Sequence, residues 1–233
     1  MTEKETVHGY HRFYNRAVAS LLQRETPRPP AMVEIGVWKG ESIPFWRALA
    51  RPWKYIGLDL SVDPSHDPFV DLRQLDQSDP AALDAFVAHE REMQRNSILL
   101  IVDDGSHVPD HQVLTFNKLF PLLEEGGLYM IEDIETSYWS RGSLYNRYEV
   151  RCGFHHPGSV VERFKQALDV VNLNFLHEDN RRELNRVCAA CGFDPLVLRS
   201  VRTITFGPNF ILMEKKTQDD LRFDQPYRLS VLL

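Results

Sequence analysis

Residues 98–107 have the sequence ILLIVDDGSH, in which five apolar residues lead directly into two aspartates, a glycine, a serine and a histidine. An uninterrupted apolar run of this length is typical of a strand that is covered on both faces of a parallel sheet. In sheets of this kind, ligands bind at the carboxyl ends of the strands. The stretch therefore predicts a buried strand whose polar end, residues 103–107, faces a ligand site.

Strand-like and helix-like patterns alternate on both sides of this stretch. The alternation predicts an α/β, Rossmann-like fold with a mostly parallel, seven-stranded sheet, helices on both faces and a C-terminal antiparallel hairpin. The hairpin is signalled by Gly207-Pro208-Asn209, which separates two apolar segments. Strands are expected at residues 32–37, 55–60, 69–72, 98–102, 128–131, 197–205 and 210–214, and helices at residues 10–23, 41–49, 80–91, 109–123, 159–173 and 179–191.

A proline-rich segment, residues 24–31, separates the first helix from the alternating region. A chain of 233 residues suits one larger α/β domain with a small addition. We therefore expect an N-terminal helical segment (residues 1–30), a Rossmann-like domain (residues 31–216) and a C-terminal tail (residues 217–233). The tail ends in apolar residues that can pack on its own core or on a second copy, so a homo-oligomer is left open.

The composition limits the location and the partners that we expect. The formal net charge of −6, from 27 basic and 33 acidic residues, argues against nucleic acid or an anionic membrane as the main partner. No apolar run approaches the roughly 20 residues that span a bilayer, and the polar residues 1–12 lack the apolar centre of a signal peptide. The sequence therefore predicts a cytoplasmic protein with a small-molecule substrate. Cys152, Cys188 and Cys191 are too few for a disulfide framework, and the last two are expected to be ordinary buried thiols.

A glycine-containing turn follows the first expected strand. Residues 34–40 are EIGVWKG, and Gly36 and Gly40 let the backbone turn tightly next to a ligand. Asp59 ends the second strand, where an acidic side chain can accept hydrogen bonds from both hydroxyls of a ribose. Turn chemistry and a capping aspartate explain the same residues, so the pattern alone leaves both interpretations open. The spacing is not G-x-G-x-x-G, which argues against a nicotinamide-dependent dehydrogenase.

A second acidic cluster, Glu132-Asp133, follows the strand expected next to residues 98–102. Carboxylates from neighbouring strand ends repel one another unless a cation lies between them. Oxygen ligands favour Mg²⁺ or Mn²⁺. His107 can join such a metal or stand beside it as a base, because histidine exchanges protons near neutral pH. Helix capping by Asp103-Asp104 and by Glu132-Asp133 is the alternative explanation.

The pattern Glu-x-Gly-x-x-x-Gly, followed by acidic strand ends, resembles the first motif of class I methyltransferases, which bind S-adenosylmethionine. The resemblance implies that Glu34 orients the amino group of the methionine moiety, that Asp59 holds the ribose, and that Asp76-Gln77 lies at the adenine. The cofactor-binding residues expected from it are Glu34, Gly36, Gly40, Ser42, Asp59, Leu60, Asp76, Gln77 and Asp103.

The motifs DDGSH (residues 103–107), FPLLEEGGLY (120–129) and IEDIETSYW (131–139) resemble the macrocin and mycinamicin O-methyltransferases, which methylate sugar hydroxyls in antibiotic biosynthesis. Cephalosporin-hydroxylase-like proteins share the fold and part of the motif set. The resemblance implies S-adenosylmethionine and Mg²⁺ (or Mn²⁺) as cofactors, and His107 as the general base. It also implies Asp104, Glu132 and Asp133 as metal ligands. Tyr138 and Trp139 closely follow these ligands and could stack on a sugar ring, although packing in the core or in a lid explains them equally well.

Two other functions stay open beside the methyltransferase. A metal-dependent oxygenase with two histidines and one carboxylate needs a second histidine near the acidic cluster, and His111 is the near candidate. A binding module without activity could keep the cofactor fold, although retention of the three carboxylates and His107 argues against it.

Overall fold

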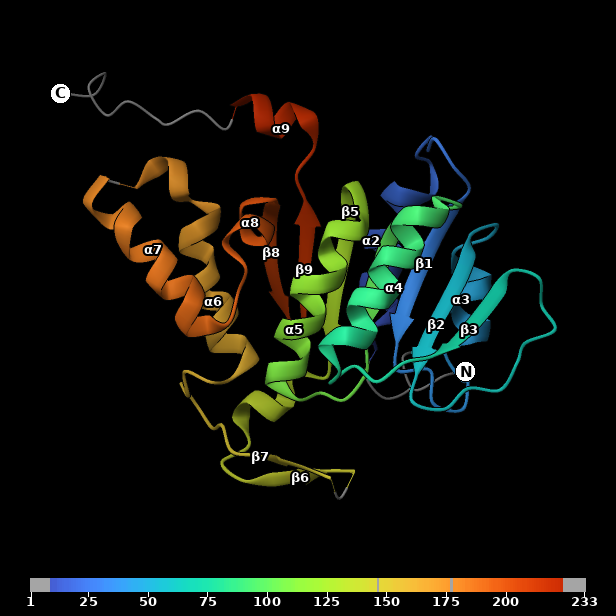
Figure 1. The fold of residues 1–233 in the computed structure, drawn as a ribbon, viewed down its shortest axis with the longest axis horizontal. Helices are drawn as coiled ribbons and strands as arrows, with labels where there is room; N and C mark the ends of the chain where they lie inside the picture. Colours follow the sequence, from blue (N-terminus) through green and yellow to red (C-terminus); the bar gives the residue numbers. More distant parts are fainter. Residues whose placement is uncertain (1–8, 146, 177, 224–233) are drawn as a thin grey trace.

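A seven-stranded sheet forms the centre of the protein in the computed structural model, which describes residues 9–145, 147–176 and 178–223 (Figure 1). The strand order is β3-β2-β1-β4-β5-β9-β8, and the pairs from β3 to β5 are parallel whereas β9 is antiparallel to both of its neighbours. The predicted fold class is therefore confirmed. The strands are β1 Pro30–Ile35, β2 Lys54–Asp59, β3 Val70–Gln74, β4 Ser97–Asp103, β5 Leu123–Glu132, β8 Val201–Gly207 and β9 Phe210–Lys215.

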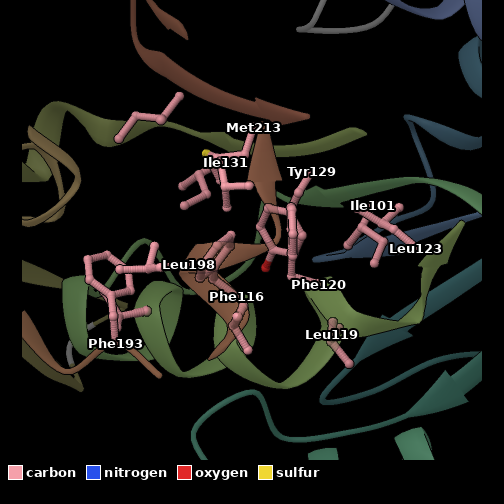
Figure 2. Packing of buried hydrophobic residues seen from close by; sticks show 14 of the residues in the cluster. Ile101, Phe116, Leu119, Phe120, Leu123, Tyr129, Ile131, Phe193, Leu198 and Met213 are labelled. Carbon is pink, nitrogen blue, oxygen red and sulfur yellow. The ribbon is translucent and has the colours of Figure 1, made fainter. Parts of the chain in front are cut away.

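Helices cover both faces of the sheet (Figure 1). One face carries α4 (Pro80–Met93), α5 (Pro109–Leu119) and α6 (Val160–Val171), and the other carries α2 (His11–Leu22) and α3 (Ile43–Leu49). The first face holds the larger core cluster, in which Phe116 of α5 makes an edge contact with Tyr129 of β5, with ring centroids 5.4 Å apart (Figure 2). The other helices are α7 Glu178–Cys191, α8 Pro195–Arg199 and α9 Gln218–Phe223, with short 3-10 helices η1 Phe120–Leu122, η2 Ile134–Tyr138 and η3 Leu173–Phe175.

The N-terminal helix is confirmed and shares a core with the sheet. Tyr14, Val18 and Leu21 are buried along one side of α2, because residues spaced by about three or four positions lie on one helix face. They pack in the second core cluster with Trp46 and Leu100. This packing places the start of α2 near the carboxyl end of β5, where the candidate site lies.

Proline explains two of the larger differences between the predicted and the observed boundaries. The helix expected at residues 109–123 ends at Leu119, because Pro121 lacks the N–H that would continue it, and β5 already begins at Leu123. The strand expected from residue 197 begins at Val201. Before it, Pro195 occupies the first turn of α8.

The structure adds a small hairpin that the sequence did not predict. Its strands, β6 Gly142–Leu144 and β7 Tyr148–Val150, are antiparallel and separate from the main sheet. Figure 1 shows the hairpin beyond the carboxyl ends of the parallel strands. It is therefore placed to form a wall of the candidate site.

Cys188 and Cys191 are buried free thiols, as expected. Within residues 9–223, the described helices include none with both the length and the apolar character to cross a membrane. In the tail, α9 lies within the described residues, whereas residues 224–233 lie outside them.

Candidate active site

A cavity of about 540 Å³ opens at the carboxyl ends of the parallel strands. Its walls come from the segments that follow β1 to β5 and from the β6–β7 hairpin. Of the predicted cofactor-binding residues, those that line it are Gly36, Ser42, Asp59, Leu60, Asp76 and Gln77, whereas Glu34, Gly40 and Asp103 do not. Of the predicted metal and catalytic residues, Asp104, His107, Glu132 and Asp133 all line it.

Gly36 is required where two strand-end turns meet. Its φ is +89°, and a Cβ at this position would lie 2.0 Å from the carbonyl oxygen of Asp104. Asp59 holds the same turn, because its Oδ2 accepts hydrogen bonds from the backbone N–H groups of Val37 (2.8 Å) and Trp38 (2.7 Å). The structure thus gives Asp59 the turn-stabilising contacts of the simpler interpretation, and it also places this side chain on the cavity wall.

Gln77 connects the end of β3 to the end of β4. Its amide donates to Asp103 Oδ1 (2.7 Å) and its Oε1 accepts from the backbone N–H of Ser106 (2.8 Å). Asp103 is fully buried, and this burial raises the pKa of its carboxyl to about 7. Asp103 therefore lies behind the wall and supports Gln77 and the turn that follows β4.

Glu34 is buried without reaching the cavity. Its carboxylate accepts hydrogen bonds from Ser42 (2.6 Å), the Trp46 indole (2.8 Å) and the Tyr55 hydroxyl. Three donors compensate the burial of its charge. The contact with a methionine amino group that the resemblance implies for Glu34 stays a prediction, whereas Ser42 lies at the cavity wall itself.

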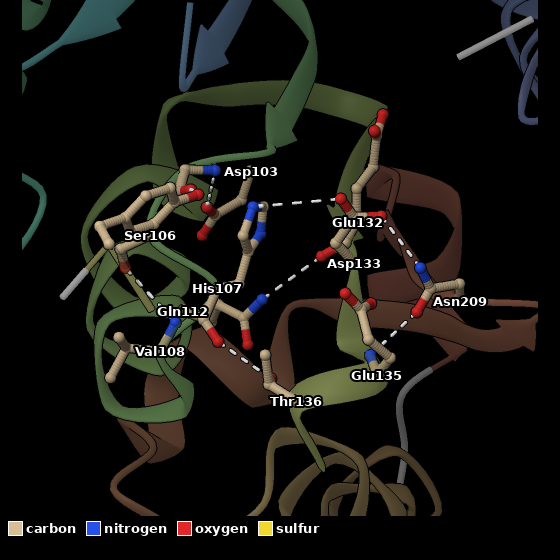
Figure 3. A network of polar contacts seen from close by, with 12 residues as sticks. Asp103, Ser106, His107, Val108, Gln112, Glu132, Asp133, Glu135, Thr136 and Asn209 are labelled. Carbon is tan, nitrogen blue, oxygen red and sulfur yellow. Dashed lines mark hydrogen bonds and ion pairs between the residues drawn. The ribbon is translucent and has the colours of Figure 1, made fainter. Parts of the chain in front are cut away.

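The acidic strand ends converge with His107. Asp104, His107 and Asp133 each offer a ligand atom, and these atoms all lie within 4.8 Å of one another. His107 Nε2 is 4.0 Å from Asp133 Oδ2, and Figure 3 shows the two side chains facing each other. Both residues have a positive φ, +55° and +53°, a conformation that is costly outside glycine and accumulates at functional sites.

This donor set fits a hard divalent cation. Two oxygens on opposite sides of one Mg²⁺ lie about 4.2 Å apart, twice the metal–oxygen distance. The ligand atoms of Asp104 and Asp133 lie within 4.8 Å of each other, which is close to that separation. Glu132 is not part of the group, although it lines the same cavity, and one of its oxygens accepts a hydrogen bond from the Tyr14 hydroxyl. Its role as a third ligand stays a prediction.

Two tyrosines that the sequence analysis did not single out contact the acidic pair. The Tyr10 hydroxyl donates to Asp133 Oδ1 (2.6 Å), and the Tyr14 hydroxyl donates to Glu132. Burial, reinforced by these carboxylates, raises the pKa of both phenols, so both keep their protons and act as donors. In the sequence they belong to the apolar face of a helix, which indicates only core packing.

The aromatic residues at the cavity differ from those expected. Tyr138 is 53% exposed, and neither it nor Trp139 lines the cavity. Tyr145 and Tyr148 of the β6–β7 region line it instead; the Tyr145 hydroxyl donates to the Gly105 carbonyl (3.3 Å). Strands of three residues carry too little pattern for the sequence to have indicated them.

His111 is not placed as a second metal-binding histidine. Its Nδ1 lies 2.9 Å from Ser106 Oγ, its ring makes an edge contact with Tyr148, and burial lowers its pKa. Among the described residues, the group that can hold a metal contains His107 and not His111. The arrangement that a two-histidine oxygenase requires is therefore not formed here.

The fold, with a cavity at the carboxyl ends of its parallel strands, is similar to that of a methyltransferase of known structure. Over 92% of this chain and 51% of the matched chain, the structure superimposes on the MycE methyltransferase of the mycinamycin biosynthetic pathway in complex with Mg and SAH, with a TM-score of 0.71 and 25% identity. A MycE complex that also contains mycinamycin VI matches with a TM-score of 0.70 and 24% identity, over 92% of this chain and 50% of that one. No family model matches the chain.

Sequence comparison identifies the particular relatives. The 8-demethyl-8-alpha-L-rhamnosyl tetracenomycin-C 2'-O-methyltransferase of Streptomyces olivaceus is 34% identical over 146 residues, which are 59% of this chain and 36% of the relative. The mycinamicin VI 2''-O-methyltransferase of Micromonospora griseorubida is 34% identical over 117 residues, 46% of this chain and 28% of the relative. The chain is thus homologous to sugar O-methyltransferases of macrolide and tetracenomycin pathways, and it matches no more than about half the length of these relatives.

Proposed function

We propose that this chain is an S-adenosylmethionine-dependent, divalent-metal-assisted O-methyltransferase that acts on a sugar hydroxyl of a glycosylated natural product. The observation that carries the proposal is that the Asp104–His107–Asp133 group and the Gly36–Asp59 turn open into one cavity. The relatives named above support the reaction class and the substrate class, because all of them are sugar O-methyltransferases. The location expected for such an enzyme is the cytoplasm.

The cofactor side of the cavity suits a nucleoside with an amino acid tail. Gly36 lets the backbone come close to the ligand, and Asp59 and Leu60 stand at the end of β2 where a ribose would bind. Asp76 and Gln77, at the end of β3, would contact the adenine. Three predicted residues would act from behind this wall. Glu34 would act through its hydrogen bond with Ser42, Asp103 would act through its hydrogen bond with Gln77, and Gly40 would act through the shape of the turn.

The metal side suits a hydroxyl acceptor. Asp104 and Asp133, with Glu132, would hold Mg²⁺ or Mn²⁺. When bound, the dication lowers the pKa of a coordinated hydroxyl, and S-adenosylmethionine supplies the methyl group. His107 would accept the hydroxyl proton at Nε2, the nitrogen that faces Asp133. The Thr136 hydroxyl donates to the His107 carbonyl (2.9 Å) and so holds the backbone of this residue in place. Tyr138 and Trp139 stay candidates for contacts with the acceptor.

Calorimetry and a transfer assay test the proposal. We expect S-adenosylhomocysteine to bind the purified chain and NAD not to bind. With radiolabelled S-adenosylmethionine and a panel of glycosylated polyketides, EDTA should abolish methyl transfer and added Mg²⁺ should restore it. Binding of NAD without S-adenosylhomocysteine, or full transfer after EDTA treatment and dialysis, would contradict the proposal.

A further inference from the structure

The start of α2 supplies a hydrogen-bond donor to each acidic residue at the end of β5. Tyr10 and Tyr14 are four positions apart, so one helical turn separates them and both face the sheet. The Tyr10 hydroxyl donates to Asp133 Oδ1 at 2.6 Å, and the Tyr14 hydroxyl donates to Glu132 Oε1. Each hydroxyl thus contacts a different carboxylate of the same strand end.

Packing fixes both hydroxyls. The Tyr14 ring makes an edge contact with Trp46 at 4.5 Å between centroids, and the Tyr10 ring makes one with Phe210 at 6.4 Å. Both tyrosines are 1% exposed, and Val18, further along α2, is fully buried on the same side. Because the rings are held in the core, the hydroxyls can set the orientation of the carboxylates rather than follow it.

Asp133 is held from a second side by the turn between β8 and β9. The Asn209 amide donates to Asp133 Oδ1 at 2.9 Å, so the same oxygen that receives the Tyr10 hydroxyl receives this donor too (Figure 3). The other oxygen, Oδ2, is the one that faces His107 Nε2. Two donors on Oδ1 therefore orient Oδ2 toward the cavity.

We propose that Tyr10, Tyr14 and Asn209 are positioning residues for the cation site, and that Asp133 offers the cation Oδ2 alone. This inference rests on the metal site of the proposed function. Mg²⁺ demands nearly ideal octahedral geometry, so carboxylates held in one orientation bind it better than carboxylates free to rotate. The hydroxyl donors also reduce the repulsion between the adjacent carboxylates of Glu132 and Asp133.

Removal of single hydroxyl groups tests the inference. Tyr10→Phe and Tyr14→Phe keep the packed rings and delete only the donors. We expect each variant to bind Mn²⁺, followed by the loss of the free-ion signal in electron paramagnetic resonance, about 10-fold or more weakly than the unchanged chain. The affinity for S-adenosylhomocysteine, measured by calorimetry without metal, should stay within about twofold, since neither hydroxyl lies on the cofactor side.

Tyr55→Phe is the matched control. It deletes another buried hydroxyl that donates to a glutamate, Glu34, which does not line the cavity, whereas Glu132 does. Its affinity for Mn²⁺ should not change. If Tyr14→Phe does not fold, Asn209→Gly takes its place, because Asn209 has a φ of +61° that glycine adopts freely.

Each outcome decides between the claims. Mn²⁺ binding within twofold of the unchanged chain in the tyrosine and Asn209 variants would overturn the inference and leave the metal site intact. An equal loss in Tyr55→Phe would overturn it as well, because the loss would then reflect general destabilisation. An unchanged chain that binds no Mn²⁺ would overturn both this inference and the proposed metal site.

Discussion

His107 combines two features that seldom occur together outside functional sites. It is a non-glycine residue with a φ of +55°, and its Nδ1 is buried without a hydrogen-bond partner. Asp133, which it faces, also has a positive φ. Conformations of this kind cost about 1–3 kcal/mol each and persist where the surroundings hold them. The two residues therefore store strain at the point where the proposed proton transfer takes place.

Replacing His107 tests its proposed role as the base. Because asparagine tolerates a positive φ, His107→Asn should fold, and kcat at saturating Mg²⁺ should fall about 10²–10⁴-fold, the usual contribution of a general base. The affinity for S-adenosylhomocysteine should not change. If excess Mg²⁺ restores the rate instead, His107 is a metal ligand and not the base.

Gly36 offers a test of the contact between the first and fourth strand ends. Gly36→Ala would place a Cβ 2.0 Å from the Asp104 carbonyl oxygen, in a backbone with φ +89°. We expect the free energy of unfolding to fall by about 1–2 kcal/mol from the backbone conformation and by about 1–3 kcal/mol more from the overlap. Denaturant unfolding measures the change.

Gly153→Ala is the control for that change. Gly153 also has a positive φ, +101°, but the nearest atom to an added Cβ is 3.7 Å away. This variant should show the conformational cost alone. Equal destabilisation by the two substitutions would show that the close approach of the two turns is unimportant.

At the scale of elements, the sequence predicts those whose pattern is long and periodic. The apolar run of β4 and the buried spacing of α2 were sufficient for their assignment, since tertiary contacts there agree with the local pattern. The β6–β7 hairpin was not predictable, because each strand has three residues and pairs only with the other. The Tyr10–Asp133 contact was not predictable either, since its partners are 123 positions apart and a helix face indicates burial without naming the partner.

The short helix α8 shows how a local signal can outweigh an apolar pattern. Residues 197–199 are apolar or basic and were expected in a strand, yet Asp194 accepts a hydrogen bond from the Leu196 N–H (2.8 Å) and caps a helix. Asp194→Ala should therefore lower the free energy of unfolding by about 0.5–2 kcal/mol, measured by thermal or denaturant unfolding. Asp194→Asn should retain most of the stabilisation that the cap provides. Equal losses in both variants would show that the hydrogen bond from the Leu196 N–H is not the source of the stabilisation.

At the scale of the whole molecule, two core clusters on opposite faces of the sheet meet at the candidate site. The cluster that contains α2 supports Glu132 and Asp133 through Tyr14 and Tyr10, and the cluster that contains α5 supports the turn from which His107 projects. The acidic residues that converge there repel one another in the absence of a cation. Binding of a cation should therefore be linked to the stability of the entire fold, since the residues that hold it belong to both cores.

Thermal unfolding with and without ligands measures this linkage. A ligand at about 100 times its dissociation constant stabilises the folded state by about 2.7 kcal/mol, which for a chain of this size raises Tm by about 5–10 °C. We expect Mg²⁺ and S-adenosylhomocysteine each to produce such a shift. Asp133→Asn, which keeps a side chain suited to the positive φ but loses the charge, should abolish the Mg²⁺ shift and leave the S-adenosylhomocysteine shift in place. A Mg²⁺ shift of the same size in Asp133→Asn would mean that the cation binds elsewhere, and the Asp104–His107–Asp133 group would no longer explain the metal dependence.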